Sequence, residues 1–129
     1  MPPAFPKAEY ETRLAKVRTV MALRGLDALV IGDPNSHNWL TGYDMIWYHL
    51  ENLTGVLLRA DTGEATFFDS VAHTTIVSTT LSIDECVWLD AAAVSGEVSE
   101  AIQIIVDEIT RRGLGGARIG FERRGYAPA

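Results

Sequence analysis

Short apolar runs alternate along this chain with segments of helical periodicity, and a glycine or proline stands at most of the junctions. Strands that alternate with helices are typical of a sheet that carries helices on both faces. The length, 129 residues, is that of one domain and is sufficient to bury a hydrophobic core. We therefore predict an α/β fold, a single three-layer α/β/α domain over residues 1–129, with a mixed sheet of about five or six strands.

Three segments carry helix signals. In the first, apolar side chains recur at helical spacing and Gly25 follows as a suitable C-terminal cap. In the second, Asp33 is a good N-cap and Pro34 suits the first helical turn. The third begins with acidic residues and ends with basic ones, as the helix dipole favours. The predicted helices span Lys7–Arg24, Asn35–Leu40 and about Gly96–Arg112.

The remaining apolar runs predict strands, and the turn Ala60–Gly63 joins two of them as a hairpin. The segment Ser70–Thr80 is ambiguous, because Asp69 before it is a suitable helix cap whereas its Thr, Val and Ile residues prefer strands. We favour a helix there. The predicted strands span Leu26–Ile31, Leu53–Arg59, Glu64–Phe68, Cys86–Leu89 and Arg118–Phe121.

The distribution of charge excludes several kinds of partner. The net charge is -6, and no Lys or Arg lies between Arg59 and Arg111, where ten acidic residues fall. Nucleic acids and anionic membranes require a basic surface, so neither is an expected partner. No apolar run approaches the ~20 residues that span a bilayer. The N-terminus lacks the basic and apolar regions of a signal peptide, so we expect a cytoplasmic protein.

Residues suited to metal binding or nucleophilic catalysis are sparse. The histidines are His37, His49 and His73, with no helical pair among them, and we interpret them as loop or surface residues. The single cysteine, Cys86, opens an apolar strand without a basic neighbour and is predicted to be an unreactive core thiol. Neither a dinucleotide-binding nor a phosphate-loop glycine pattern occurs. We therefore predict no catalytic residue and no metal ligand in this chain.

An aromatic cluster between residues 39 and 49 is the best candidate for recognition. Trp39 and Leu40 fit core contacts of the short helix. The residues that follow lie in a predicted loop, where amphipathic aromatic side chains serve recognition or subunit contact as readily as packing. The candidate substrate-pocket or interface residues are Tyr43, Trp47, Tyr48 and His49.

Three stretches together resemble a known family. They are Glu9-Tyr10-Glu11-x-Arg13-Leu14, then Met21-x-x-x-Gly25-Leu26-Asp27-Ala28-Leu29-Val30, then Asp33-Pro34-x-x-x-x-Trp39-Leu40-Thr41-Gly42-Tyr43. The late stretch Ile119-Gly120-Phe121-Glu122 adds to the likeness. The chain is similar to the N-terminal domain of the creatinase and prolidase family of metallohydrolases, which includes Xaa-Pro dipeptidases, aminopeptidase P, creatinase and ectoine hydrolase-like enzymes.

The resemblance implies a non-catalytic domain that forms a homodimer and helps to shape the substrate pocket. It also implies two divalent metal ions (Mn, Co or Zn) in a separate C-terminal catalytic domain, which we expect to be absent from this chain because the sequence stops abruptly after the last predicted strand. The implied substrate is a small peptide or small amide. The loop Tyr43–Asn52 lacks the arginine that holds creatine in creatinase, which argues against creatine.

Three alternatives remain open. In the first, the parent protein is not an Xaa-Pro peptidase but a creatinase- or ectoine hydrolase-like amidinohydrolase or amide hydrolase. Alternatively, the domain is a non-enzymatic peptide-binding module, as in histone-chaperone subunits that resemble these peptidases. A free-standing flavodoxin-like domain is the third, although the glycines of a phosphate loop are missing.

Overall fold

The computed structural model describes residues 3–43, 55–70, 73–80, 85–89 and 98–122. The helices in these ranges are α1 (Lys7–Leu23), α2 (Pro34–Thr41), α3 (Thr74–Thr80) and α5 (Val98–Arg111). The strands are β1 (Ala28–Ile31), β2 (Gly55–Arg59), β3 (Ala65–Ser70), β4 (Glu85–Leu89) and β5 (Ile119–Phe121). None of the helices in these ranges is both long and apolar enough to cross a membrane.

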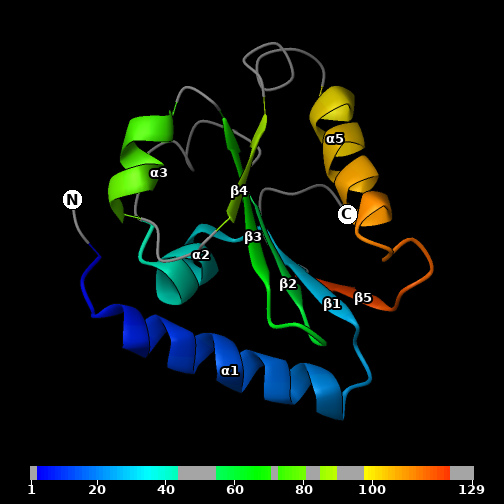
Figure 1. Ribbon diagram of the computed structural model, residues 1–129, viewed down its shortest axis with the longest axis horizontal. Coiled ribbons are helices and arrows are strands. Elements are labelled where there is room, and N and C mark those ends of the chain that lie inside the picture. The colour runs from blue at the N-terminus through cyan, green and yellow to red at the C-terminus, as the bar shows by residue number, and fades with distance from the viewer. Residues whose placement is uncertain (1–2, 44–54, 71–72, 81–84, 90–97, 123–129) are drawn as a thin grey trace.

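The strands form a mixed five-stranded sheet in the order β4-β3-β2-β1-β5. Strand β2 is antiparallel to both β1 and β3, whereas β4 is parallel to β3 and β5 is parallel to β1. Helices α1, α2 and α3 lie on one face of the sheet and α5 lies on the other (Figure 1). The predicted three-layer α/β/α fold with a mixed sheet is confirmed.

Each face of the sheet has its own apolar core. The α1–α2–α3 face buries Ile31, Leu40, Tyr43, Val56, Phe67 and Val77. The α5 face buries Ala28, Val30, Leu57, Phe68, Ile109 and Leu114. Neighbouring residues of β1, β2 and β3 alternate between the two cores because successive side chains of a strand point to opposite faces.

The helix ends follow the sequence signals. The Asp33 carboxylate accepts hydrogen bonds from the backbone N–H groups of Asn35 and Ser36, which confirms it as the N-cap of α2. Gly25 has a φ of +66° after α1, where its N–H donates to the carbonyl of Ala22 and the next N–H, of Leu26, donates to that of Met21. This pair of bonds satisfies carbonyl groups that a helix end leaves unpaired.

One predicted boundary is wrong. Asp69 was expected to cap a helix that starts at Ser70, but β3 continues through Ser70, which pairs with Leu89 of β4. The parallel pairing with β4 extends the strand beyond the point where the local signal would end it. The favoured helix within Ser70–Thr80 is present, and it starts later, at Thr74.

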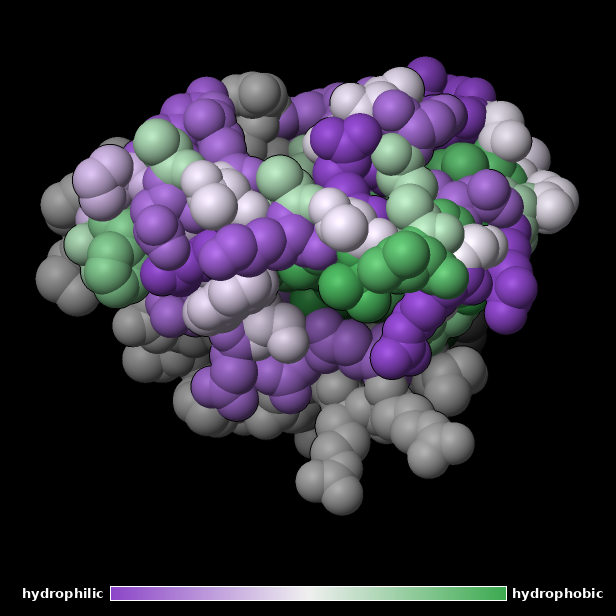
Figure 2. Space-filling view, turned by 90° about the horizontal axis from the view of Figure 1, so that it is seen from below, coloured by the Kyte–Doolittle hydropathy of each residue, from purple (hydrophilic) through white to green (hydrophobic). Residues whose placement is uncertain are grey.

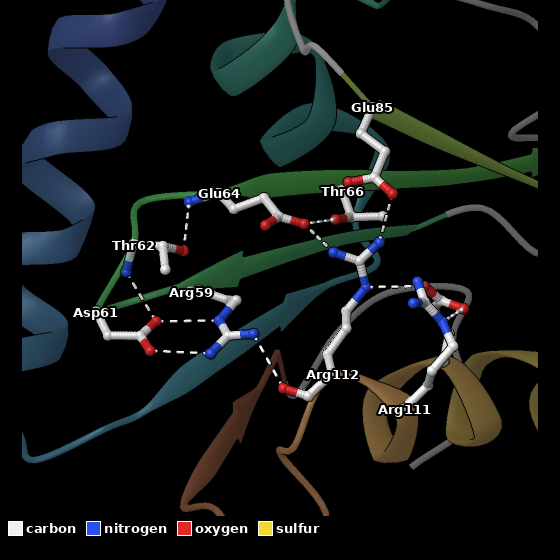
Figure 3. Close-up of polar contacts among 9 residues, drawn as sticks. Arg59, Asp61, Thr62, Glu64, Thr66, Glu85, Arg111 and Arg112 are labelled. Atoms are coloured by element: carbon white, nitrogen blue, oxygen red, sulfur yellow. Dashed lines mark hydrogen bonds and ion pairs between the residues drawn. The ribbon is translucent and has the colours of Figure 1, made fainter.

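Arg112 joins the end of α5 to one end of the sheet (Figure 3). Its Nε donates to Glu108 of α5 at 2.9 Å, its Nη2 donates to Glu85 of β4 at 2.6 Å, and its Nη1 donates to Glu64 beside β3. Only 7% of the Arg112 side chain is exposed, so these three carboxylates replace most of its water. Charge-assisted bonds of this kind are stronger than neutral ones.

We expect Arg112→Ala to lower the free energy of unfolding by about 1–3 kcal/mol, because three carboxylates lose a shared donor. Urea unfolding of the chain measures the effect. The matched control is Arg111→Ala, since Arg111 is 67% exposed and, among the described residues, pairs with Glu108 alone. This change should alter the free energy of unfolding by no more than about 0.5 kcal/mol. Equal losses in the two variants would show that the shared donor has no special role.

Candidate functional site

Asp69 lies at the centre of a buried polar cluster on the α1–α2–α3 face of the sheet. It is fully buried near the end of β3. The Tyr43 hydroxyl donates to its Oδ2 at 2.6 Å, and Nδ1 of His73 lies 2.8 Å from its Oδ1. Both carboxylate oxygens therefore have a partner, as a buried carboxylate requires.

The end of α2 places Tyr43 beside Asp69. Gly42 has a φ of +76°, which ends the helix and turns the chain back toward the sheet. A side chain at Gly42 would also collide with Tyr10, whose hydroxyl oxygen would lie 2.8 Å from an added Cβ. The Tyr43 ring then packs edge-on against Phe67 of β3, with ring centroids 5.0 Å apart.

His37 belongs to the same region and is fully buried on α2. Its Nε2 lies 2.8 Å from the carbonyl oxygen of Ile31, so this nitrogen is the donor. The ring also packs edge-on against Phe67 at 5.6 Å. Burial lowers the pKa of His37, and the Ile31 hydrogen bond and the Asp69 and Asp33 carboxylates oppose that shift only in part.

Cys86 lies on β4 next to this cluster. Burial, with a smaller contribution from the nearby Asp69 carboxylate, raises the pKa of its thiol to about 12. The thiol is therefore protonated at neutral pH, and a protonated thiol is a poor nucleophile. Its partial burial and raised pKa agree with the prediction of an unreactive thiol.

Of the four candidate residues predicted from the sequence, the structure describes one, Tyr43. Tyr43 is fully buried, and its hydroxyl is engaged by Asp69, so within this chain it belongs to the core. Trp47, Tyr48 and His49 lie outside the described residues. Their role as pocket or interface residues therefore stays a prediction.

Three other expectations are wrong. His37 and His73 are buried, not loop or surface residues, because a backbone carbonyl and a carboxylate satisfy their rings. Trp39 was expected in the core with Leu40, but 46% of it is exposed. A sequence signal existed for His37, which precedes the buried Leu40 by three residues and so lies on the same helix face. No sequence signal indicated that His73, just before α3, would contact Asp69 of β3.

The described residues do not supply a metal centre. No group of three or more His, Cys, Asp or Glu side chains that could hold an ion occurs among them. The nearest approach is the pair of Asp69 and His73, in which each carboxylate oxygen is already engaged. A pair of divalent metal ions therefore does not fit this part of the chain.

The model of the creatinase/prolidase N-terminal domain matches residues 13–128. The chain belongs to this family. The predicted resemblance is thus confirmed, and the five-stranded sheet with helices on both faces is the fold of its N-terminal domains.

Solved structures and one curated relative agree with this family. An Xaa-Pro dipeptidase from Bacillus anthracis matches with a TM-score of 0.65 and 17% identity, over 92% of this chain and 27% of that one. The N-terminal domain of an X-Pro dipeptidase from Streptococcus pyogenes matches with a TM-score of 0.59 and 16% identity, over 87% and 92% of the two chains. At these identities the likeness concerns the fold.

Ectoine hydrolase from Halomonas elongata is 62% identical over 40 residues. That stretch is 31% of this chain and 10% of ectoine hydrolase, so the match covers only a small part of the curated relative. It nevertheless indicates close local kinship, since 62% far exceeds the identity to the two dipeptidase structures.

We expect Tyr43→Phe to lower the free energy of unfolding by about 1–3 kcal/mol, because the fully buried Asp69 carboxylate loses the Tyr43 hydroxyl as a donor. Urea unfolding measures the loss. Tyr10→Phe is the control: Tyr10 is as deeply buried, but its hydroxyl accepts a longer hydrogen bond, of 3.3 Å, from the backbone N–H of Phe5. An equal loss of stability in Tyr10→Phe would show that the bond to Asp69 contributes no more than that of another buried hydroxyl.

We also expect stability to fall on acidification through His37. Its pKa in the folded chain lies below 6.5, so below about pH 6.5 the unfolded chain binds a proton that the folded chain does not. The free energy of unfolding is then highest above that pH and decreases by at most about 1.4 kcal/mol per pH unit for this group. Urea unfolding between about pH 7.5 and 5.5 should show a shallower decline in His37→Gln. Identical slopes would assign the acid sensitivity to other groups.

Proposed function

We propose that this chain is the non-catalytic N-terminal domain of a longer, cytoplasmic, homodimeric and metal-dependent hydrolase, in which it contributes to the subunit contact and to the wall of the substrate pocket. The observation that carries the proposal is the family match over residues 13–128. The relatives also support it, since the chain corresponds to only 27% of the Bacillus anthracis dipeptidase.

The internal use of the polar side chains supports a non-catalytic role. Asp69 is held by Tyr43 and His73, and Arg112 by three glutamates. Groups that act on a substrate must be able to reach it. We propose that the two divalent ions (Mn, Co or Zn) are held by a separate catalytic domain, which would supply the activated water for hydrolysis.

Two substrate classes follow from the relatives. Xaa-Pro peptides are favoured by the Bacillus anthracis and Streptococcus pyogenes dipeptidases, which share the fold over most of this chain. Ectoine or a similar small amide is favoured by the 62% identity to ectoine hydrolase over 40 residues. We retain both, with the peptide as the first candidate.

The pocket-wall role is proposed for Trp47, Tyr48 and His49. Its support comes from the sequence, where these residues follow Tyr43 within six positions and form an amphipathic aromatic group. Tyr43 contributes from the core, because its bond to Asp69 fixes the point at which the chain leaves α2.

The first test separates this domain from a catalytic one. Calorimetric titration of the chain alone with Mn²⁺, Co²⁺ and Zn²⁺ should give no pair of micromolar sites, and the chain should hydrolyse neither an Xaa-Pro dipeptide nor ectoine. The complete protein, loaded with metal, should hydrolyse one of the two. Two tight sites together with dipeptide cleavage by the chain alone would overturn the proposal, and a metal-free, inactive complete protein would favour a binding module.

The second test concerns the pocket wall. Replacing Trp47, Tyr48 and His49 together by Ala should change the stability of the chain by no more than about 0.5 kcal/mol. In the complete protein the same change should raise KM or lower kcat/KM, because the pocket loses contacts. Trp88→Ala is the control, since Trp88 is an exposed aromatic residue on β4. A large loss of stability with unaltered kinetics would mean that the three residues only pack.

A further inference from the structure

An open apolar groove runs beside the C-terminal half of α1. One wall is formed by Val17, Val20 and Met21 of α1, the other by Trp39 of α2, and Leu26 and Leu29 form the floor. The groove has a volume of about 430 Å³. Figure 2 views the α1 side of the molecule and shows an apolar patch bordered by hydrophilic surface.

The side chains of this groove are exposed to an unusual degree for their type. Half of Val20 and 46% of Trp39 are accessible. Single exposed apolar residues are ordinary, but a contiguous group with an aromatic residue marks an interaction surface.

Leu26 and Leu29, which line the groove, lie close to Gly120 of β5. Gly120 of β5 pairs with Leu29 of β1, and a Cβ added at Gly120 would lie 3.0 Å from Leu26 and 3.1 Å from Leu29. A second hollow, which shares Val17, Leu29 and Trp39 with the first, extends the groove to Glu122.

Two cationic side chains line the groove. Lys16 and Arg24 form no ion pair or side-chain hydrogen bond with the part of the chain that the structure describes. On the same helix, by contrast, Arg13 pairs with Glu9 and Arg18 donates to the carbonyl of Ala60. The groove therefore offers an apolar surface with positive charge at its edge, which suits an acidic and apolar occupant.

The same charges argue against a second copy of this chain as the occupant. A two-fold contact through α1, centred on Val20, would place Lys16 of each copy against Arg24 of the other, because the two residues are each four positions from Val20. Like charges in contact oppose association.

We propose that this groove docks an amphipathic segment, apolar on one side and bordered by Asp or Glu, from the part of the same polypeptide that follows residue 129. The proposal rests on the proposed function, in which this domain precedes a catalytic domain. Glu122, the last described residue, lines the far end of the groove, so the chain leaves β5 at the groove itself. Docking there would fix the orientation of this domain relative to the catalytic one.

Thiol labelling tests the proposal. Val20→Cys should react with a maleimide at least about tenfold more slowly in the complete protein than in the 129-residue chain, because docking covers it. Val106→Cys is the matched control, since Val106 is 45% exposed on α5 and lies away from the groove; it should react equally in both. The native thiol of Cys86, with a pKa of about 12, reacts slowly, and peptide mass spectrometry separates the sites. Trp39→Cys, which lies in the same groove and is 46% exposed, serves if Val20→Cys does not fold.

The charge of the occupant is tested in the complete protein. Lys16→Glu with Arg24→Glu should raise the labelling rate of Val20→Cys several-fold, because an acidic segment is then repelled. Lys7→Glu with Arg111→Glu makes the same change of charge elsewhere and should leave the rate unaltered. Equal rates for Val20→Cys in the chain and in the complete protein would overturn the proposal, as would protection that grows with protein concentration, which would indicate a second copy. The labelling rates do not depend on catalysis, so the proposed function is tested separately by hydrolase assays.

Discussion

The buried carboxylate of Asp69 constrains more of this fold than any other polar group described. A carboxylate without water needs donors, and here they come from two different elements: Tyr43 at the end of α2 and His73 at the start of α3. Both helices are thereby fixed to the end of β3. Burial raises the pKa of Cys86 on the neighbouring strand, and the Asp69 charge adds to this effect.

Strand β3 is the element through which the two faces of the sheet are joined. At its C-terminal end, Asp69 connects it to the helices of one face. Just before its N-terminal end, Glu64 receives Arg112 from the end of α5, on the other face (Figure 3). The two connections differ in kind. Asp69 is fully buried, whereas 38% of the Glu64 side chain is exposed, so water screens the second more than the first.

Local signals in the sequence predicted the elements well and the environment of single residues less well. The Asp33 cap, the glycine after α1 and the helical stripe that buries Tyr10 and Met21 are determined within a few residues of chain, so the sequence reveals them. The end of β3 was misplaced because its pairing with β4 is a long-range contact. The spacing to Leu40 indicated the helix face of His37, but no sequence pattern specifies the carbonyl of Ile31 as its hydrogen-bond partner.

The wrong core prediction for Trp39 concerns a residue that also lines the groove beside α1. On an amphipathic helix of eight residues, Leu40 points to the core and Trp39 does not, so a helical stripe that includes one tends to exclude the other. Its indole is nevertheless held in place, because the Arg13 guanidinium lies 5.2 Å from its ring centre and donates to its carbonyl at 2.8 Å. An exposed aromatic residue held in this way loses little conformational entropy when a partner covers it. The docking proposed for the groove beside α1 would therefore use such a surface, while the polar cluster beneath it is used within the domain.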